Sequence, residues 1–368
     1  MVNLVYIGVV KMSEIKTIPT VTINELRTLI PTIGKELTVV VQSEPGCGKT
    51  SLLHMMEEDL GDKYDYIYVD CPVKDMSDIA MTIPNHDTKT LDSYVGSLFK
   101  LSSPKPKVIL LDEFMKSPKL LQVIFTRMML ERCVGDTPLP EGSIVFATSN
   151  NASDGVGDSM LAHAGNRVCI VRMEKPDSDS WIPWATVNGV SALVRSWVEM
   201  NKRCLKSYTQ SGQEDNPFIF NPSKTVLSFV SPRSLAKADV IVKFRDTLGE
   251  KATLAALAGT VGASAAGSMS AFFSIEKQIP HFEVIIKSPD TIEIPTENAA
   301  LLMVLFNGVD SITTQDMMTK FMTFVKRIPS KELQSLFFTM CMRNSKTVTV
   351  ARGNEDIKTW SYNNSHLF

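Results

Sequence analysis

Five strand-like runs recur along the first part of the chain, with polar or amphipathic segments between them, and four of these runs are mainly apolar. Apolar runs of this length are typical of strands buried on both faces of a parallel sheet. Because helical patterns alternate with these runs, we expect an α/β fold with a three-layer αβα core and a parallel sheet, whose ligands bind at the carboxyl ends of the strands. The predicted strands are 37–41, 64–71, 108–113, 144–150 and 168–171.

Segments with helical spacing and start signals lie between the strands. Thr22 and Glu25 have the spacing of a capping box, and apolar residues follow at helical intervals. Ser117-Pro118 is expected to cap and open another helix. Residues 76–90 are polar and are expected to form an irregular connection. The helices predicted in this part of the chain are 22–33, 51 to about 61, 91–101 and 118 to about 133.

The pattern changes after residue 176. Helical periodicity without a buried strand fills 178–279, interrupted by a polar break from 209 to 222, and the remainder alternates short helices with room for a β pair. The segment 252–273 is long enough to be tested as a membrane span, but its Ala, Gly and Ser content favours a closely packed pair of soluble helices. The expected domains are an N-terminal extension 1–20, an αβα core 21–177, a helical domain 178–285 and a mostly helical C-terminal extension 286–368. Helices expected in the extension are 297–307, 315–327 and 331–343.

A glycine-containing loop joins the first long strand to the helix that starts at residue 51. Gly46 and Gly48 lack a Cβ, so the backbone can turn sharply and bring its N–H groups close to phosphate oxygens. The helix start adds the positive end of a dipole. This strand–loop–helix context predicts a P-loop that binds ATP and Mg²⁺, and the alternative is a glycine turn without nucleotide. The predicted nucleotide-binding residues are Ser43, Glu44, Pro45, Gly46, Cys47, Gly48, Lys49, Thr50 and Ser51, with Ser43 standing where the motif prefers glycine.

Two acids follow the apolar strand 108–111. One carboxylate of this pair, Asp112, can hold Mg²⁺ together with the Thr50 hydroxyl, and Glu113 can orient or polarise the attacking water. The alternative is a strand end turning into solvent, where acids are common. Asn150 ends the next strand, where an amide can position water near the γ-phosphate, although Asn151 beside it is a rival for that role.

Two arginines are candidate phosphate ligands. Arg167 follows 161–166 just before the last strand, from where a guanidinium can project into the nucleotide of a neighbouring subunit. Ser231-Pro232 caps and opens a helix, so Arg233 lies at a helix N-terminus, where guanidinium and dipole together favour anionic phosphate. The alternative for both is an ordinary surface arginine.

Charge and cysteine content limit the other classes of function. The 368 residues carry a net charge of −2, which gives no electrostatic case for wrapping nucleic acid. The six cysteines are scattered without a CxxC pair, so a zinc site is not expected, and they indicate thiols of a reducing compartment. The apolar N-terminus is short and has no basic leader, so we expect a cytoplasmic protein without a signal peptide or membrane span.

Short motifs follow one another in a fixed order: SEPGCGKT, VILLDE, LPEGSIVFATSN at 139–150, NR at 166–167 and SPRS at 231–234. Together they resemble the AAA+ ATPases, most closely the MoxR branch and its relatives encoded beside partner proteins in bacterial and phage genomes. The segment LAGTVGASAAGSMSAFF is similar to the lid of that branch. One departure is Gly165-Asn166, where the family usually has an acid before the arginine.

The resemblance implies a ring, expected to be a hexamer, that hydrolyses ATP and remodels a protein partner such as a von Willebrand A-type protein. Residues 80–90 could supply a pore loop, although a plain surface loop is the simpler interpretation. The implied roles are Lys49 and Thr50 at the phosphates and Mg²⁺, Asp112 on Mg²⁺, Glu113 activating water, Asn150 sensing the γ-phosphate, Arg167 as the finger in trans and Arg233 as the lid sensor.

Two further hypotheses use the same fold. A nucleic-acid motor or loader predicts a basic channel and salt-dependent binding, which the balanced charge disfavours. A non-hydrolysing nucleotide-binding scaffold is disfavoured by the intact Glu113.

Overall fold

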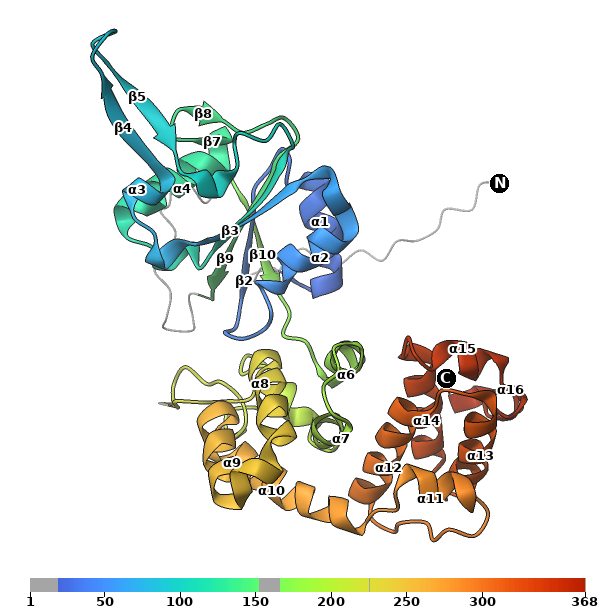
Figure 1. Ribbon diagram of the computed structural model, residues 1–368. Helices are drawn as coiled ribbons and strands as arrows, with labels where there is room; N and C mark the ends of the chain where they lie inside the picture. The colour runs from blue at the N-terminus through green and yellow to red at the C-terminus, as the bar shows by residue number, and fades with distance from the viewer. Residues whose placement is uncertain (1–18, 152–165, 225, 368) are drawn as a thin grey trace, which may run out of the picture. The chain divides into compact units, whose positions relative to one another are not determined.

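The computed structural model describes residues 19–151, 166–224 and 226–367. The chain divides into two compact units (Figure 1). The first unit contains the chain up to Glu44 and Gly48–Glu174, and the second contains Lys175 onwards. The short loop Pro45–Cys47 groups with the second unit.

The first unit is built on a six-stranded parallel sheet, which confirms the expected α/β fold class. The strand order is β1-β10-β2-β9-β6-β3, so β9 lies between β2 and β6. Nearly every residue of β2, β6 and β9 is buried, as expected for strands covered on both faces. The strands are β1 Thr20–Val21, β2 Val39–Ser43, β3 Asp65–Asp70, β6 Lys107–Asp112, β9 Ile144–Asn150 and β10 Cys169–Met173.

Three helices of this unit follow the sequence signals. Helix α1 (Ile23–Ile33) starts with the predicted capping box, in which the Thr22 side chain accepts from the Glu25 N–H and Glu25 accepts from the Thr22 N–H. Helix α2 (Ser51–Leu60) ends at Gly61 as predicted. The cap expected for α4 (Lys119–Glu131) is wrong: Pro118 is the N-cap, and the Ser117 hydroxyl donates to the Phe114 carbonyl at 2.6 Å, inside the preceding turn.

The expected irregular connection 76–90 and helix 91–101 are wrong. A short helix α3 (Met76–Ile79) leads into β4 (Ala80–Asn85), which pairs antiparallel with β5 (Thr90–Val95) in a hairpin that projects from the core (Figure 1). Both faces of the hairpin carry exposed residues, so it has no helical stripe and no single buried face. A second small hairpin joins β7 (Cys133–Val134) to β8 (Thr137–Pro138).

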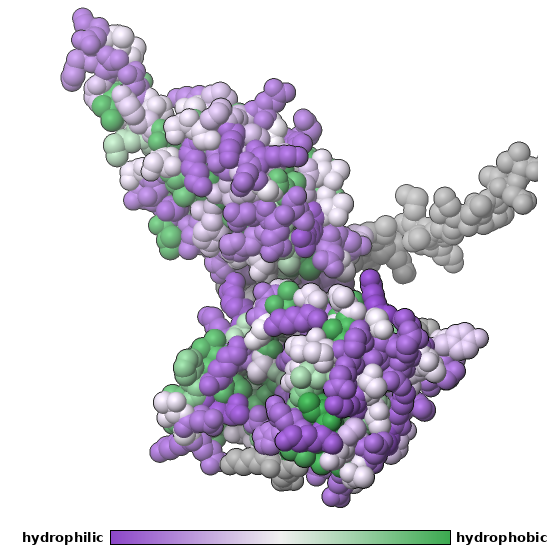
Figure 2. Space-filling model, turned by 45° about the vertical axis from the view of Figure 1, so that its right-hand side comes forward, coloured by the Kyte–Doolittle hydropathy of each residue, from purple (hydrophilic) through white to green (hydrophobic). Residues whose placement is uncertain are grey.

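Some hydrophobic side chains are exposed at the surface. Exposed hydrophobic side chains occur on the β4–β5 hairpin, where Met81, Leu91 and Tyr94 are at least half exposed. Figure 2 shows one face of the molecule, on which hydrophobic residues form small patches between hydrophilic ones. Small apolar patches of this kind are normal on a protein surface.

The second unit is helical, as its periodicity predicts. One hydrophobic core runs through it from Trp181 to Trp360. The possible β pair of the C-terminal part is not found, because the described residues 286–367 contain helices and turns and no strand. The helices are α6 Ser178–Val187, α7 Ala192–Met200, α8 Pro232–Lys243, α9 Arg245–Val261, α10 Ala263–Ser274, α11 Phe282–Lys287, α12 Asn298–Ser311, α13 Gln315–Lys326, α14 Lys331–Arg343, α15 Val348–Gly353 and α16 Glu355–Asn363.

The segment 252–273 forms a packed helix pair, as predicted. Helices α9 and α10 contact each other and are separated at Gly262, whose φ of 89° is in the left-handed region that favours glycine. In the described parts of the chain, no helix has both the length and the apolar character needed to cross a membrane. Short 3₁₀ turns complete the structure at Gly61–Lys63, Cys71–Val73, Ser97–Phe99, Phe114–Lys116, Lys202–Leu205, Ile275–Gln278 and Ser365–Leu367.

Candidate functional site

The strand register brings the predicted polar residues of the core to one edge of the sheet. Ser43 at the end of β2 pairs with Asn150 at the end of β9, and Asp112 ends β6 next to Asp70 of β3. Parallel strands end at the same edge, so the loop after β2 and the two acids after β6 lie on either side of Asn150. This edge is the candidate site.

The P-loop holds its lysine inside the site. Gly46 and Gly48 have φ values of 77° and 93°, which glycine adopts without strain. The Lys49 side chain is buried, and its Nζ donates to the Ser43 carbonyl at 3.0 Å, to the Glu44 carbonyl at 3.1 Å and to Asn150 Oδ1 at 3.0 Å. A buried cation needs such acceptors.

Ser43 has a direct role in this arrangement. Its Oγ accepts a hydrogen bond from Lys49 Nζ at 3.1 Å and donates to the Glu44 carbonyl at 3.1 Å. The hydroxyl at the position where the motif prefers glycine therefore helps to hold the lysine. Ser43 is 1% exposed, so its side chain lies inside the fold and leaves the surface of the loop to the backbone.

Asp112 is held by three hydroxyl groups. Its Oδ2 accepts from Thr50 Oγ1 at 3.1 Å and from the Tyr68 hydroxyl at 3.0 Å, and its Oδ1 accepts a short hydrogen bond from Thr148 Oγ1. Burial, followed by the negative charge of Asp112, raises the pKa of Tyr68, so the phenol stays protonated and remains a donor. The carboxylate is therefore fixed in one orientation facing Thr50.

Glu113 has an unusual backbone conformation. Its φ of 50° lies in the left-handed region, which is uncommon for a residue with a side chain. The Glu113 N–H donates to Thr148 Oγ1 at 3.1 Å, and the carboxylate forms an ion pair with Lys116 Nζ at 2.8 Å. The side chain is 38% exposed, so water reaches this carboxylate.

The residues at this edge fit Mg²⁺. A hydroxyl has one proton and two lone pairs, so Thr50 can ligate a metal ion through its oxygen while it donates to Asp112. Mg²⁺ prefers oxygen ligands and takes only one or two from the protein when phosphate supplies others. Among the residues that the structure describes, no group of three or more His, Cys, Asp or Glu side chains could hold a metal ion.

The two candidate arginines lie outside this set of contacts. Arg167 is exposed just before β10, and residues 161–165 ahead of it lie outside the described residues. Arg233 is exposed in the first turn of α8, after the predicted cap at Ser231. Within the second unit, the backbone N–H of Arg233 donates to the Gly46 carbonyl at 3.2 Å.

Two residues of the site were not predicted from the sequence. Tyr68 lies in β3 and Thr148 in β9, and both donate to Asp112. The available signal was position: Thr148 precedes Asn150 by two residues, so both side chains project from the same face of a strand. A polar residue in an otherwise apolar strand also indicates a partner inside the fold.

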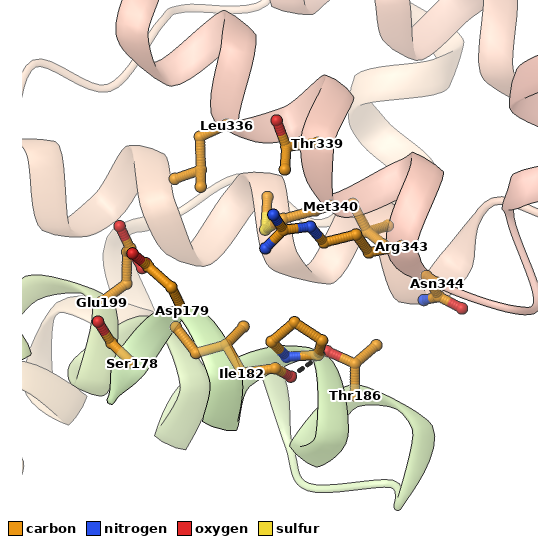
Figure 3. A pocket seen from close by; sticks show the side chains of 12 residues that line it. Ser178, Asp179, Ile182, Thr186, Glu199, Leu336, Thr339, Met340, Arg343 and Asn344 are labelled. Carbon is orange, nitrogen blue, oxygen red and sulfur yellow. Dashed lines mark hydrogen bonds between the residues drawn. The ribbon is translucent and has the colours of Figure 1, made fainter. Parts of the chain in front are cut away.

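A small pocket in the second unit offers no competing site. Residues of α6 and α14 face each other across it, with Arg343 extending over Met340 (Figure 3). Its volume is about 50 Å³, enough for a few water molecules and too small for a nucleotide. Two carboxylates on its lining, Asp179 and Glu199, already form ion pairs with Lys202.

Comparison with known proteins supports the P-loop part of this description. Residues 39–137 match the model of the viral superfamily 1 RNA helicase core domain, a stretch that includes the loop after β2 and the two acids after β6. A search of curated proteins gives no match. The loop between β2 and α2, the parallel sheet and this match together support a P-loop NTPase fold.

Several solved structures have detectable similarity to the chain. They include a candidate ATPase from Cytophaga hutchinsonii, which is 15% identical over 74% of this chain and 90% of that chain, with a TM-score of 0.33. The RuvB Holliday junction branch migration motor of Thermotoga maritima is 13% identical over 73% of this chain and 75% of that chain, with a TM-score of 0.34. NtrX from Brucella abortus is 10% identical over 93% of this chain and 68% of that chain, with a TM-score of 0.32.

Proposed function

We propose that this chain is a Mg²⁺-dependent ATPase of the AAA+ type. The observation that carries the proposal is the convergence of Lys49, Thr50 and Asp112 with Asn150 and Glu113 at the carboxyl edge of one sheet. A phosphate-binding loop, a pair of oxygen ligands for Mg²⁺ and an acid open to water are the parts that phosphoryl transfer to water requires.

Each residue has a distinct role in the proposed reaction. Lys49 binds the β- and γ-phosphates, and Thr50 and Asp112 hold Mg²⁺, which neutralises charge on the phosphates when bound. Glu113 takes a proton from the attacking water. Asn150 accepts from Lys49 through Oδ1, which leaves its Nδ2 hydrogens on the other side of the amide to orient water or phosphate. Gly46, Cys47 and Gly48 supply backbone N–H groups, whereas Pro45 has none.

The proposal extends to assembly. Arg167 would act across the interface of a ring, expected to be a hexamer, and Arg233 would couple the lid 178–285 to the nucleotide on the core 21–177. The ring would remodel a protein partner, as in the MoxR branch, and a von Willebrand A-type protein is the first partner to test. Support comes from the order of the motifs and from the exposure of both arginines.

A phosphate-release assay tests the catalytic part. Lys49→Ala removes the phosphate ligand and is expected to abolish both ATP binding and hydrolysis. Lys35→Ala is the matched control, because Lys35 is an exposed lysine that precedes β2 at the opposite edge of the sheet. If Lys49→Ala hydrolysed ATP at the wild-type rate, Lys49 would have no role in phosphate binding and the proposal would fail.

Mixing two inactive variants tests the finger in trans. A Lys49→Ala subunit keeps Arg167, and an Arg167→Ala subunit keeps its P-loop, so their mixture is expected to recover part of the activity that neither has alone. Each variant measured alone at the same total concentration is the control. If the ATPase activity of the mixture does not exceed the sum of the activities of the two variants measured alone, the idea of a site shared between subunits is contradicted.

A nucleic-acid motor is the second candidate, and the match to an RNA helicase core domain favours it. It predicts that RNA or DNA stimulates hydrolysis, with binding that weakens steeply as salt rises. The net charge of −2 argues against extensive phosphate contacts. ATPase rates with and without single-stranded RNA and DNA, at two salt concentrations, distinguish this candidate from a protein remodeller. Absence of any hydrolysis alongside ATP binding would instead favour a scaffold.

A further inference from the structure

One buried hydroxyl, that of Thr148, forms hydrogen bonds with the Asp112 carboxylate and with the Glu113 backbone. Thr148 lies in β9, is 0% exposed, and uses a single oxygen for two contacts. Its Oγ1 donates to Asp112 Oδ1 and accepts from the Glu113 N–H at 3.1 Å. A hydroxyl has one proton and two lone pairs, so this pattern fixes the direction of its proton toward the carboxylate.

The contact to Glu113 also supports a strained backbone. A left-handed conformation is unfavourable for a residue with a Cβ, and Glu113 has a φ of 50°. This conformation lets the chain turn after β6, and the hydrogen bond to Thr148 compensates part of its cost. Without the hydroxyl, the Glu113 N–H would lose the acceptor that holds it in this turn.

We propose that Thr148 is a positioning residue for hydrolysis, an inference that rests on the proposed ATPase function. It sets the plane of the Asp112 carboxylate for Mg²⁺ and the direction in which Glu113 leaves its strand. Because Thr148 and Asn150 lie two positions apart on β9, it also ties the strand that carries Asn150 to both acids. A shift of β9 at the γ-phosphate is thereby transmitted to Glu113.

Tyr68 provides an internal comparison. Its hydroxyl donates to the other oxygen of the same carboxylate, Asp112 Oδ2, and it has no contact with Glu113 in the hydrogen bonds described above. Loss of the Tyr68 hydroxyl therefore removes one support of Asp112 alone. Loss of the Thr148 hydroxyl removes one support of Asp112 together with the support of Glu113.

The test compares Thr148→Val, which has nearly the same shape without the hydroxyl, with Thr148→Ser, which keeps it. We expect Thr148→Val to lower kcat about 10- to 100-fold with little change in KM for ATP, and Thr148→Ser to restore most of kcat. Tyr68→Phe should lower kcat less than Thr148→Val. Equal loss in the valine and serine variants would show that packing, rather than the hydroxyl, matters and would overturn the proposal.

A metal-binding measurement separates this inference from the ATPase proposal. Mn²⁺ binding to the full chain with ADP, followed by electron paramagnetic resonance, is expected to weaken about 10- to 100-fold in Thr148→Val and to stay near wild type in Thr148→Ser. If the wild type released no phosphate, the proposed function would fail, yet this comparison would still decide the role of Thr148. Unchanged Mn²⁺ affinity together with unchanged kcat in the valine variant would refute it.

Hydrogen exchange tests the contact between Thr148 and Glu113 without a substitution. It therefore remains available if the Thr148→Val variant does not fold. The amide of Glu113 in the unmodified protein should be protected, because its hydrogen is bound to a fully buried oxygen. Exchange at the rate of an exposed loop amide would mean that the Thr148 contact is not maintained and would contradict the inference.

Discussion

At the scale of single residues, two candidate ligands of the site are held by several hydrogen bonds each. Lys49 is held by carbonyl, hydroxyl and amide oxygens of Ser43, Glu44 and Asn150, and Asp112 by three hydroxyls. Interactions that are formed in advance lower the reorganisation needed during the reaction. In the proposed reaction, these contacts would hold Lys49 and Asp112 in position.

Glu113 is the exception, since its carboxylate is paired with Lys116. Both side chains are about one-third exposed, and a pair of this kind contributes about 0 to 1 kcal/mol. Lys116→Ala is therefore expected to change kcat by less than about fivefold, measured by steady-state phosphate release. A loss as large as that expected for Lys49→Ala would mean that Lys116 itself takes part in the reaction.

At the scale of elements, strands β2, β6 and β9 were predictable because each contains an apolar run that ends in a polar residue. The β4–β5 hairpin was not, because its residues are exposed on both faces and leave neither a helical nor a strand pattern. The C-terminal helices α15 and α16 were missed for another reason. The β-branched run 347–350 has strand propensity, and packing of Ala351 into the helical core overrides it.

The sequence pointed to some residues of the candidate site and not to others. Motif spacing located Lys49, Thr50 and both acids, because each follows the end of a recognisable strand. Thr148 and Tyr68 depend on which strands are neighbours, and the sequence does not state that β9 lies between β2 and β6.

Strands β3 and β6 share one buried ion pair that gives a prediction on stability. Lys107 is 0% exposed, and its Nζ donates to Asp65 Oδ2 at 2.6 Å, a hydrogen bond that lowers the pKa of Asp65. Asp65→Asn is expected to destabilise the first unit by about 1.5 to 3 kcal/mol at pH 7. The measurement is urea unfolding followed by far-ultraviolet circular dichroism.

The pH dependence of this difference has a definite sign. A carboxyl whose pKa is lowered by folding contributes stability above its ordinary pKa of about 3.9, and the contribution disappears as pH falls through the lowered value. The difference in unfolding free energy between wild type and Asp65→Asn should therefore be complete at pH 6 to 7. It should shrink as pH falls below about 4 and disappear below the lowered pKa of Asp65. A difference that stayed constant into acid would rule out the ion pair as its cause.

At the scale of the whole molecule, the two units can be observed separately. All four tryptophans, Trp181, Trp184, Trp197 and Trp360, belong to the second unit. Tryptophan fluorescence therefore reports on the helical unit, whereas Asp65→Asn acts on the sheet. We expect this variant to shift the circular dichroism transition more than the fluorescence transition. Equal shifts would mean that the two units unfold as one.

The central claim is that water prepared at Glu113 cleaves a triphosphate bound by the P-loop, and Glu113→Gln tests it most directly. The amide keeps the shape of the side chain but cannot accept the proton, so kcat for phosphate release should fall about 10²- to 10⁴-fold. ATP should remain bound, because Lys49, Thr50 and Asp112 are unchanged. Hydrolysis at the wild-type rate by Glu113→Gln, with ATP and Mg²⁺ saturating, would contradict the account.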